Sequence, residues 1–529
     1  MRDHVCAVDV GTTSARTGIF DGNGRLLARA ESPFPLSRIG PDTAEYESEA
    51  IWRAVAAATR AALMDAGLPA GSVAAIGFGA TCSLVVRTGD GSPIDISSDG
   101  TARDTIAWCD HRALAEAEAC TATGHAVLAH LGGVMSPEMQ PPKLMWLKAN
   151  RQNVWGRAGL IFDLADFLTW RATGSRRRSV CTLTSKWTYL AHDKGWQADF
   201  LEAVGLDDLA ARTGIDGAPA DVGERLGRLS PDAADDLGLD TECVVSAGLV
   251  DAYAGALGVL GGLPEAQLET DAALIGGTSS CVMTLSRRPR ASHGAWGPFR
   301  GAVLPDYWVT EGGQSAAGSL LDYVISTFGG EASPDAESHR RVIDRIAVLR
   351  RIEGAAFGAG IHVLPDIHGN RAPFADPHAR GVFSGLTLDC SFDNLCRVYW
   401  RTAVSLALGV RHIVERLNDD GSRIGALHIA GGHRNNPVLM DIYASATGLS
   451  LCEPETDDAV LLGSAMAAAT AAGLHESLQA ACSAMRSPVR IHAPDPAAAS
   501  GFERDYRIFL TMHDQKQALD RLMRACPDD

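Results

Sequence analysis

The chain has 529 residues, of which 46% are hydrophobic, and its formal net charge is −17. A chain of this length exceeds what one hydrophobic core accommodates, so we expect two or more domains. The acidic balance argues against nucleic acid as a partner, because phosphate backbones are bound by Lys and Arg. Twelve cysteines are scattered singly from Cys6 to Cys526, which is typical of free thiols in a reducing cytosol.

The N-terminus enters a strand directly, without a charged and then apolar leader. The most apolar stretch, 459–474, consists largely of alanine and is interrupted by polar residues, as in a close-packed core helix. We therefore expect a cytoplasmic protein that has no membrane partner.

The first informative stretch, 5–16, is an apolar strand that ends at Asp9 and is followed by the turn Gly11-Thr12-Thr13. Two further apolar runs, separated by a Gly/Asp/Asn turn, predict a β-meander up to residue 30. Such a turn at a strand end aims backbone N–H groups and hydroxyls at a phosphate, and Asp9 is suited to hold Mg²⁺ through water. The alternative is an ordinary hairpin with an aspartate-capped turn.

A helix is predicted over 45–65 and a strand over 73–78, which runs into the small residues 79–83. Small residues at a strand end let a ligand approach. Further on, Trp108 beside Asp110 offers a sugar an apolar wall and a polar partner. A helix start with a surface ion pair is the alternative for this cluster.

The stretch 182–187 places Lys186 among hydroxyls and aromatic residues, after a helix predicted over 163–173. A buried strand then leads through a glycine to Asp251, at the start of a helix of small residues. An aspartate in this position is normally a helix cap. The following segment, 255–264, is poor in bulky polar residues and is the predicted hinge and domain boundary.

Beyond this boundary, 272–283 repeats the strand, Gly/Thr/Ser turn and strand of the opening meander, which indicates an internal duplication. Two such loops are able to clamp nucleotide phosphates from both sides. In 427–437, a strand leads to Gly431-Gly432, and paired glycines let a base or ribose lie against the backbone. Helices are also predicted over 319–328, 392–417 and 495–524, the last as a helical tail that packs back on the body.

The order and spacing of four motifs resemble those of the FGGY family of carbohydrate kinases, in the actin, Hsp70 and hexokinase superfamily. These motifs are 9–14 as the first phosphate loop, 248–252 around a catalytic aspartate, 276–279 as the second phosphate loop and 431–432 as the adenosine loop. The resemblance implies an α/β fold of two RNase-H-like domains flanking an ATP/sugar cleft. The N-terminal domain, 1–257, would hold the sugar site, and the C-terminal domain, 258–529, the adenosine loop and helical tail.

The same resemblance implies roles for single residues. Asp251 is the expected general base, which accepts the proton of a primary hydroxyl as that oxygen attacks the γ-phosphate in line, and Asp9 is the expected Mg²⁺ residue. The sugar is expected to contact Thr81, Cys82, Ser83, Trp108, Asp110, Lys186, Asp251 and Glu311. ATP is expected to contact Gly11, Thr12, Thr13, Arg16, Gly277, Thr278, Ser279, Gln314, Gly318, Gly431, Gly432 and Asn435.

The run Thr81-Cys82-Ser83-Leu84-Val85 resembles the segment characteristic of D-ribulose kinases. Glycerol kinases carry a charged Arg-Glu pair there and xylulose kinases a Met-His-Gly, so the run argues against glycerol. We expect an ATP- and Mg²⁺-dependent transferase that phosphorylates the primary 5-hydroxyl of a pentulose and converts D-ribulose to D-ribulose 5-phosphate. L-ribulose, D-xylulose and the pentitol ribitol remain alternatives, because a few hydrogen bonds separate epimers.

A nucleotide-binding sugar sensor is the non-enzymatic alternative. A kinase that had lost its activity would be expected to lack Asp251 or a phosphate loop, and this chain keeps both. A homodimer is the expected assembly, although no residue in the sequence determines it.

Three residues differ from the family pattern, and one cysteine lies in the predicted sugar segment. Gln140, Val398 and Arg401 depart from the family pattern; at the first of these the family usually has Pro, Ser or Thr. Cys82 is interpreted as a packing residue near the substrate, since nothing nearby in the sequence lowers the pKa of its thiol.

Overall fold

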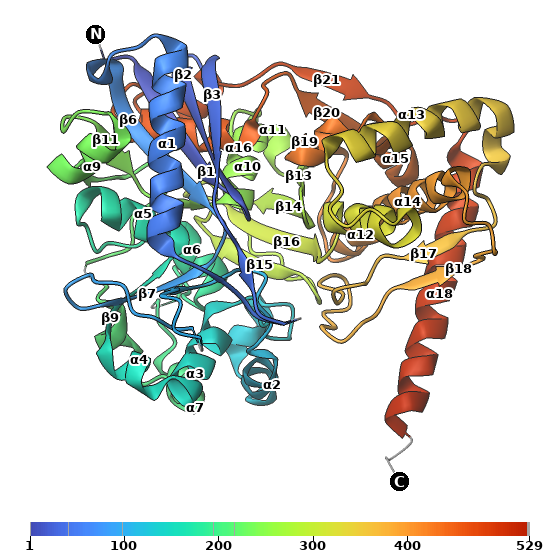
Figure 1. The fold of residues 1–529 in the computed structure, drawn as a ribbon, viewed down its shortest axis with the longest axis horizontal. Coiled ribbons are helices and arrows are strands. Elements are labelled where there is room, and N and C mark those ends of the chain that lie inside the picture. The colour runs from blue at the N-terminus through green and yellow to red at the C-terminus, as the bar shows by residue number, and fades with distance from the viewer. Residues whose placement is uncertain (1, 41, 98, 194, 216, 526–529) are drawn as a thin grey trace. The chain divides into compact units, whose positions relative to one another are not determined.

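Residues 2–40, 42–97, 99–193, 195–215 and 217–525 are described by the structure, which is a computed structural model (Figure 1). Cys526 lies outside the described residues. Residue contacts divide the chain into unit 1, which comprises Met1–Glu269, Met283–Glu311 and Pro454–Pro488, and unit 2, which comprises Thr270–Val282, Gly312–Glu453 and Val489–Asp529. The predicted halves, 1–257 and 258–529, do not coincide with these units, because two later segments pack with the N-terminal part.

The main sheet of unit 1 contains the predicted meander. Its strand order is β10 (Arg225–Arg228), β11 (Val244–Ser246), β6 (Val73–Ala80), β1 (His4–Val10), β2 (Ser14–Asp21) and β3 (Leu26–Pro33), and β12 (Leu249–Val250) also pairs with β6. The central strands β1 and β6 are apolar and almost wholly buried, whereas β3 at the edge alternates between half-buried and exposed side chains. This contrast follows from burial on both faces in the centre and on one face at the edge.

Three parallel strands of this sheet end at the same level. Val10 of β1 is opposite Ala80 of β6, and Val250 of β12 is opposite Ala80 on its other side. The segments that leave these strand ends are therefore brought together at one edge. They begin with Gly11, Thr81 and Asp251, three of the predicted site residues.

Helices with small residues cover the sheet closely. On one side, α1 (Ser48–Ala66) packs on β2 and β3 (Figure 1); α16 (Ala459–Ala471) contacts β1, β6 and α10 (Asp251–Leu260). A Cβ on Gly258 of α10 would collide with the carbonyl oxygen of Ala459, and a Cβ on Gly463 with that of Ala254. The alanine-rich stretch predicted as a close-packed core helix is confirmed as α16.

A second sheet in unit 1 is formed by strands that lie between β3 and β10 along the chain, and β6 of the first sheet falls among them. Its order is β4 (Ser37–Arg38), β5 (Ala44–Tyr46), β8 (Thr105–Ile106), β7 (Leu84–Thr88) and β9 (Ala158–Asp163). The helices between β8 and β11 along the chain are α2 (Leu114–Ala122), α3 (Gln140–Asn150), α4 (Gln152–Arg157), α5 (Leu164–Thr173), α6 (Val180–Lys186), α7 (Ala198–Ala203), α8 (Leu209–Thr213) and α9 (Pro231–Leu237). Trp108 and Asp110 precede α2 and lie in a turn, so they do not open a helix.

The other elements that lie wholly or partly in unit 1 are α11 (Glu265–Leu268), α17 (Leu478–Ala484), β14 (Ser280–Ser286), β15 (Trp296–Arg300) and β16 (Trp308–Gln314). Strands β15 and β16 pair antiparallel, with Trp296 opposite Glu311.

Unit 2 is built on parallel strands and long helices. Strand β13 (Asp271–Gly276) pairs with β19 (Ala426–Ala430), and β19 pairs with β20 (Ser450–Pro454). The other elements are β17 (His362–Leu364), β18 (Val382–Ser384), β21 (Val489–His492), α12 (Gly318–Gly329), α13 (Ala336–Glu353), α14 (Phe392–Asp419), α15 (Pro437–Thr447) and α18 (Ala499–Ala525). The helices predicted over 319–328, 392–417 and 495–524 are thus confirmed. No helix among the described residues is both long enough and apolar enough to cross a bilayer.

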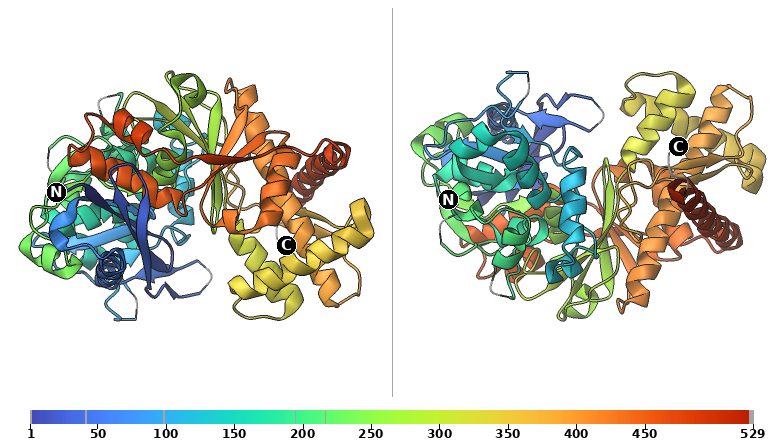
Figure 2. Two further views of the ribbon diagram at one scale, coloured as in Figure 1. Left: turned by 90° about the horizontal axis from the view of Figure 1, so that it is seen from above. Right: turned by 90° about the horizontal axis from the view of Figure 1, so that it is seen from below.

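Helix α18, dark red in Figures 1 and 2, is fastened to the body of unit 2, as predicted for the tail. Buried Arg401 of α14 forms an ion pair of 2.6 Å with Asp505 of α18 and donates a hydrogen bond of 2.7 Å to the carbonyl of Ile361. This departure from the family pattern therefore has a structural role, since it joins two helices and the start of β17.

The glycine contact between α10 and α16 predicts a stability effect. Replacing Gly463 with alanine pushes a Cβ against a backbone carbonyl that has no rotamer by which to move, so we expect a loss of about 1–3 kcal/mol in the free energy of unfolding. Gly156→Ala is the matched control, because Gly156 is exposed in α4 and, apart from neighbouring residues of its own helix, no described residue places an atom within 4 Å of its missing Cβ. Urea unfolding of both variants checks this, and equal stabilities would contradict it.

Candidate active site

The β1–β2 ladder brings Asp9 and Arg16 together. They are register partners, and Arg16 Nη2 lies 2.5 Å from Asp9 Oδ2. Burial raises the pKa of the Asp9 carboxyl to about 7, Arg16 opposes the rise, and Asp458 and Asp251 add to it. Asp458 caps the N-terminus of α16 and lies 4.0 Å from the Arg16 guanidinium. Arg29 lies 3.5 Å from the same carboxylate, so two arginines, Arg16 and Arg29, offset the carboxylates at the sheet edge.

Asp251 is the first residue of α10, directly after β12. Its Oδ1 accepts a hydrogen bond of 2.7 Å from the N–H of Ala252, and no hydrogen bond among the described residues engages its Oδ2. Burial raises the pKa of this carboxyl, whereas the Ala252 amide, Arg16 and Lys186 lower it. The carboxylate is therefore a partial cap with one oxygen available to a ligand.

The surroundings of Asp9 fit the predicted role in Mg²⁺ binding. Both carboxylate oxygens are buried, and neither has a partner with hydrogen-bond geometry among the described residues, although Arg16 lies close. Mg²⁺ keeps several waters and often uses one or two carboxylates, so a single buried aspartate suits it. No group of three or more His, Cys, Asp or Glu that could ligate a metal occurs in the described parts of the chain.

The structure joins four of the predicted residues into one polar network. The Trp108 N–H donates to Ser83 Oγ over 3.1 Å, and its indole Nε1–H donates to Thr12 Oγ1 over 3.2 Å. Thr81 Oγ1 lies 3.3 Å from Ser83 Oγ. The predicted sugar segment therefore contacts the first phosphate loop through the side chain of a tryptophan.

A second network connects Lys186 and Glu311. Lys186 Nζ lies 4.3 Å from the centre of the Trp296 ring, in cation–π geometry, and Trp296 is the register partner of Glu311. Glu311 Oε2 accepts a hydrogen bond of 3.0 Å from the hydroxyl of Tyr253, two residues after Asp251. Sequence reasoning missed Trp296 and Tyr253, although the latter directly follows the motif 248–252 around the predicted catalytic aspartate.

Asp110 is engaged inside the protein. Its fully buried carboxylate accepts hydrogen bonds from the Arg112 guanidinium, at 2.7 and 2.9 Å, and from the N–H of Ala44, at 2.7 Å. This arrangement favours the ion-pair alternative to sugar contact, although the pair is buried and does not lie on the surface. The Cys82 thiol is also buried, which raises its pKa to about 11 and agrees with a packing role.

In unit 2, hydrogen bonds hold the two predicted nucleotide loops together. The N–H groups of Gly277 and Gly318 donate to the carbonyls of Ser279 and Gly277, at 2.8 and 2.9 Å, and Ala317 N–H donates to Thr278. His433, next to the glycine pair at 431–432, donates from Nε2 to the Gly277 carbonyl at 3.0 Å. Its Nδ1 accepts from the Tyr443 hydroxyl, also at 3.0 Å.

The glycines of these loops fall into two groups. A Cβ on Gly276, Gly318 or Gly431 would press on neighbouring loop atoms, and Gly431 also has a φ of +88°. By contrast, apart from the adjacent residues, the described part of the chain places no atom within 4 Å of the missing Cβ of Gly432 and one atom near that of Gly277. The first group packs the loops against each other, and the second leaves bare backbone open to a ligand.

Gln314 and Asn435 differ in their surroundings. The buried amide of Gln314 accepts from Ser280 Oγ at 2.7 Å and donates to the carbonyl of Leu406 at 3.1 Å. Both ends of this amide are thus engaged within unit 2, which does not favour the predicted ATP contact. Asn435 is exposed, and its predicted contact stays a prediction.

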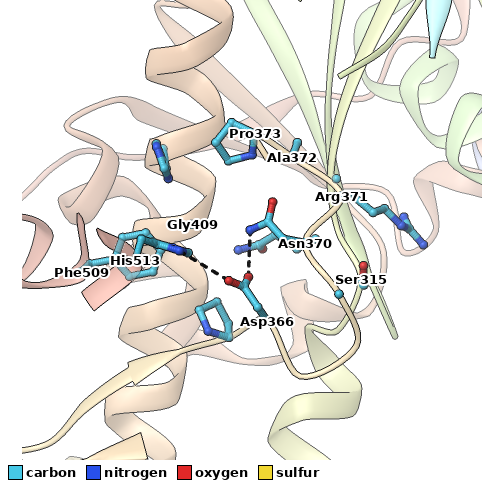
Figure 3. A pocket seen from close by; sticks show the side chains of 14 residues that line it. Ser315, Asp366, Asn370, Arg371, Ala372, Pro373, Gly409, Phe509 and His513 are labelled. Atoms are coloured by element: carbon cyan, nitrogen blue, oxygen red, sulfur yellow. Dashed lines mark hydrogen bonds and ion pairs between the residues drawn. The ribbon is translucent and has the colours of Figure 1, made fainter. Parts of the chain in front are cut away.

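A pocket in unit 2 lies where α18 meets the loop 365–373 (Figure 3). Asn370 Nδ2 donates to Asp366 Oδ1 at 3.0 Å, and His513 of α18 lies 3.6 Å from the other oxygen. Burial raises the pKa of Asp366 to about 6 and lowers that of His513 to about 4. Ser315 and Arg371 also line the pocket, and its polar cluster links α18 to the loop 365–373.

Known proteins resemble this chain in sequence and in structure. Residues 4–258 match the sequence model of the N-terminal domain of the FGGY family of carbohydrate kinases. Residues 272–472 match that of the C-terminal domain of the same family. An FGGY carbohydrate kinase domain-containing protein of Danio rerio is 39% identical over 98% of each chain. A D-ribulokinase of Saccharomyces cerevisiae is 34% identical over 88% of this chain and 71% of that protein. Xylulose kinase from Rhodospirillum rubrum has a TM-score of 0.77 over 98% of this chain and 99% of that chain, at 22% identity, which confirms the predicted two-domain α/β fold.

Because His433 is buried in its neutral form, we expect the free energy of unfolding to fall in acid. Burial lowers its pKa from 6.5 to about 4, so its contribution to the free energy of unfolding is complete above pH 6.5 and is lost as the pH falls towards 4. A His433→Gln variant keeps a donor for the Gly277 carbonyl but does not titrate. We expect it to lose less stability than the parent chain over this range, by up to about 3 kcal/mol. Unfolding midpoints in urea across the range check this, and parallel curves for both proteins would contradict it.

Proposed function

Because the chain belongs to the FGGY family of carbohydrate kinases, we propose that it transfers the γ-phosphate of ATP to the primary 5-hydroxyl of D-ribulose. Phosphoryl transfer to a carbohydrate follows from the family itself. The choice of D-ribulose is supported by the run 81–85 and by the similarity to a yeast protein named D-ribulokinase. The observation that carries the proposed chemistry is the half-buried carboxylate of Asp251, which has one oxygen unengaged and lies within electrostatic reach of Arg16 and Lys186.

Asp251 acts as the general base. Its burial makes the carboxylate more basic than an exposed one, which brings its proton affinity closer to what abstraction of a hydroxyl proton needs. Arg16 and Lys186 stabilise the ionised form, so the carboxylate is ready to accept a proton at neutral pH. The proton of the 5-hydroxyl passes to the oxygen that Ala252 leaves unengaged as the hydroxyl oxygen attacks the γ-phosphate in line.

Other residues of unit 1 bind and orient the reactants. The turn Gly11-Thr12-Thr13 offers N–H groups and hydroxyls to phosphate oxygens. Trp108 fixes the position of Thr12 and offers its ring face to the sugar, while Lys186 and Glu311 bind sugar hydroxyls. Asp9 would hold Mg²⁺, and the ion would supply positive charge to offset that of the phosphate oxygens.

The open backbone at Gly277 and Gly432 in unit 2 supports the proposed contacts with ATP. FGGY kinases use ATP, and the adenosine moiety lies against Gly431-Gly432 in this proposal. We place the reaction in the cytoplasm, where ATP is available and where the free cysteines of the described chain remain reduced. A homodimer stays our expectation for the assembly.

L-ribulose, D-xylulose and ribitol are the alternative substrates, and a sugar sensor is the non-enzymatic alternative. The xylulose kinase structures share the fold at 22% identity or less, so their names do not favour D-xylulose here. The sensor is disfavoured because Asp251 and both phosphate loops are retained.

A substrate panel tests the proposed reaction. With ATP and Mg²⁺, we expect kcat/KM for D-ribulose to exceed that for L-ribulose, D-xylulose, ribitol and glycerol by about tenfold or more, the scale on which a few hydrogen bonds discriminate. The measurement is ADP release with each sugar titrated. Preference for another sugar would overturn the choice of D-ribulose but keep the mechanism, whereas ATP binding without turnover of any sugar would favour the sensor.

The general base is tested by Asp251→Asn. We expect kcat to fall by at least ~10²-fold, since a positioned base contributes this much, while the Kd for ATP changes little. Asp232→Asn is the matched control, because Asp232 also lies in the first turn of a helix but is exposed. An Asp251→Asn enzyme with most of the parent's kcat would show that another group takes the proton.

A further inference from the structure

Gln140 and Asp163 form a buried polar pair directly behind the predicted sugar segment. Gln140 is the first residue of α3, Asp163 is the last residue of β9, and both are fully buried. Gln140 Nε2 donates to Asp163 Oδ2 at 2.9 Å and to the carbonyl of Cys82 at 3.1 Å. In the ladder between β7 and β9, Asp163 is the register partner of Leu84. The pair is therefore attached to the segment 81–84 at Cys82 and at Leu84.

One acceptor atom of each residue has no partner. Asp163 Oδ1 and Gln140 Oε1 are buried, and no hydrogen bond within the described residues reaches either of them. A buried acceptor without a donor costs free energy, and native proteins seldom leave one without a ligand or a water to satisfy it. Since both atoms accept hydrogen bonds, the missing partners are donors, such as the hydroxyl groups of a sugar or polyol.

The charges around the pair belong to the same site. Burial raises the pKa of the Asp163 carboxyl to about 7, Asp166 adds to the rise, and Gln140, Lys186 and Lys143 oppose it. Lys186 also acts on the thiol of Cys82, as Asp163 does. The unpartnered carboxylate oxygen thus lies within electrostatic reach of the lysine assigned to the sugar.

A second link connects the pair's helix to Trp108. Lys143, three residues after Gln140 in α3, donates from Nζ to the carbonyls of Ala107 and Trp108, at 3.1 and 3.4 Å. Helix α3 therefore braces the tryptophan turn with one residue and the Cys82 carbonyl with another. Both elements to which the sugar contacts are assigned are therefore bonded to α3, the helix that begins with Gln140.

We propose that Asp163 Oδ1 and Gln140 Oε1 accept hydrogen bonds from hydroxyl groups of the pentulose and thereby determine which sugar is phosphorylated. This rests on the proposed function, because it assumes that a sugar binds beside the segment 81–83. The pair recognises the positions of hydroxyl groups, since a sugar that lacks a hydroxyl, or presents it with the other configuration, leaves a buried acceptor unpaired.

Deoxy analogues of D-ribulose, each lacking one hydroxyl, test the pair together with Asp163→Asn. We expect the parent enzyme to lose at least about tenfold in kcat/KM with one of these analogues, as a site built around a hydroxyl does. The Asp163→Asn enzyme should discriminate against that analogue by less than about twofold, with an unchanged KM for ATP, because the acceptor that reads the hydroxyl is altered.

Asp166→Asn is the matched control. Asp166 is equally buried on the next helix, but Ser179 N–H and Thr182 Oγ1 satisfy its two oxygens, at 2.8 and 2.6 Å. We expect this variant to keep the parent's selectivity even if its stability falls. Gln140→Met, similar in volume, removes the second acceptor and provides an independent reading if Asp163→Asn does not fold.

Three outcomes would overturn the inference. In the first, the parent enzyme, Asp163→Asn and Gln140→Met discriminate equally against the deoxy analogue. In the second, the activity of these two variants falls equally with every sugar. In the third, the parent enzyme is indifferent to every missing hydroxyl, which would mean that buried water satisfies the two oxygens. Failure of the proposed function is seen separately, in the parent enzyme alone. If the parent prefers another sugar, the same comparison is made with deoxy forms of that sugar.

Discussion

The close contact of α10 with α16 is the constraint on which the site in unit 1 depends. Glycines at 258 and 463 let the two helix backbones touch without intervening side chains. Helix α10 then begins at Asp251, beside the ends of β1 and β6, and α16 begins at its cap, Asp458, close to Arg16. A wider spacing would move both carboxylates away from the arginine, so helix packing and charge placement are set by the same two residues.

This placement concentrates negative charge. Asp458 and Asp251 both raise the pKa of Asp9, and Arg16 interacts with all three carboxylates. Buried carboxylates with raised pKa values oppose folding, and they are commonly retained where chemistry needs them. The arrangement suits a reaction in which a cation and phosphate enter together, because the incoming cation relieves the repulsion between carboxylates that the phosphate alone would increase.

Local motifs could be predicted from the sequence, and partners distant in the chain could not. The turn after Asp9, Asp251 at its helix start and the glycine loops are visible within a dozen residues, because a strand, a turn and small residues follow one another. The engagement of Asp110 by Ala44 and of Gln314 by Leu406 depends on residues far away in sequence. Contacts of this kind also bring 454–488 into unit 1, which no local pattern signals.

Two buried glutamines differ in whether their hydrogen bonds are complete within the protein. Gln314 has a donor for its oxygen and an acceptor for its nitrogen, so both ends of its amide are engaged where it joins β16 to α14. Gln140 departs from the family pattern, has two acceptors for its nitrogen and no donor for its oxygen. A neutral sugar presents hydroxyl groups and little else, so selectivity among sugars needs buried groups that only the right hydroxyls satisfy. An unsatisfied acceptor that lowers the stability of the empty protein is, for this reason, what makes discrimination between epimers possible.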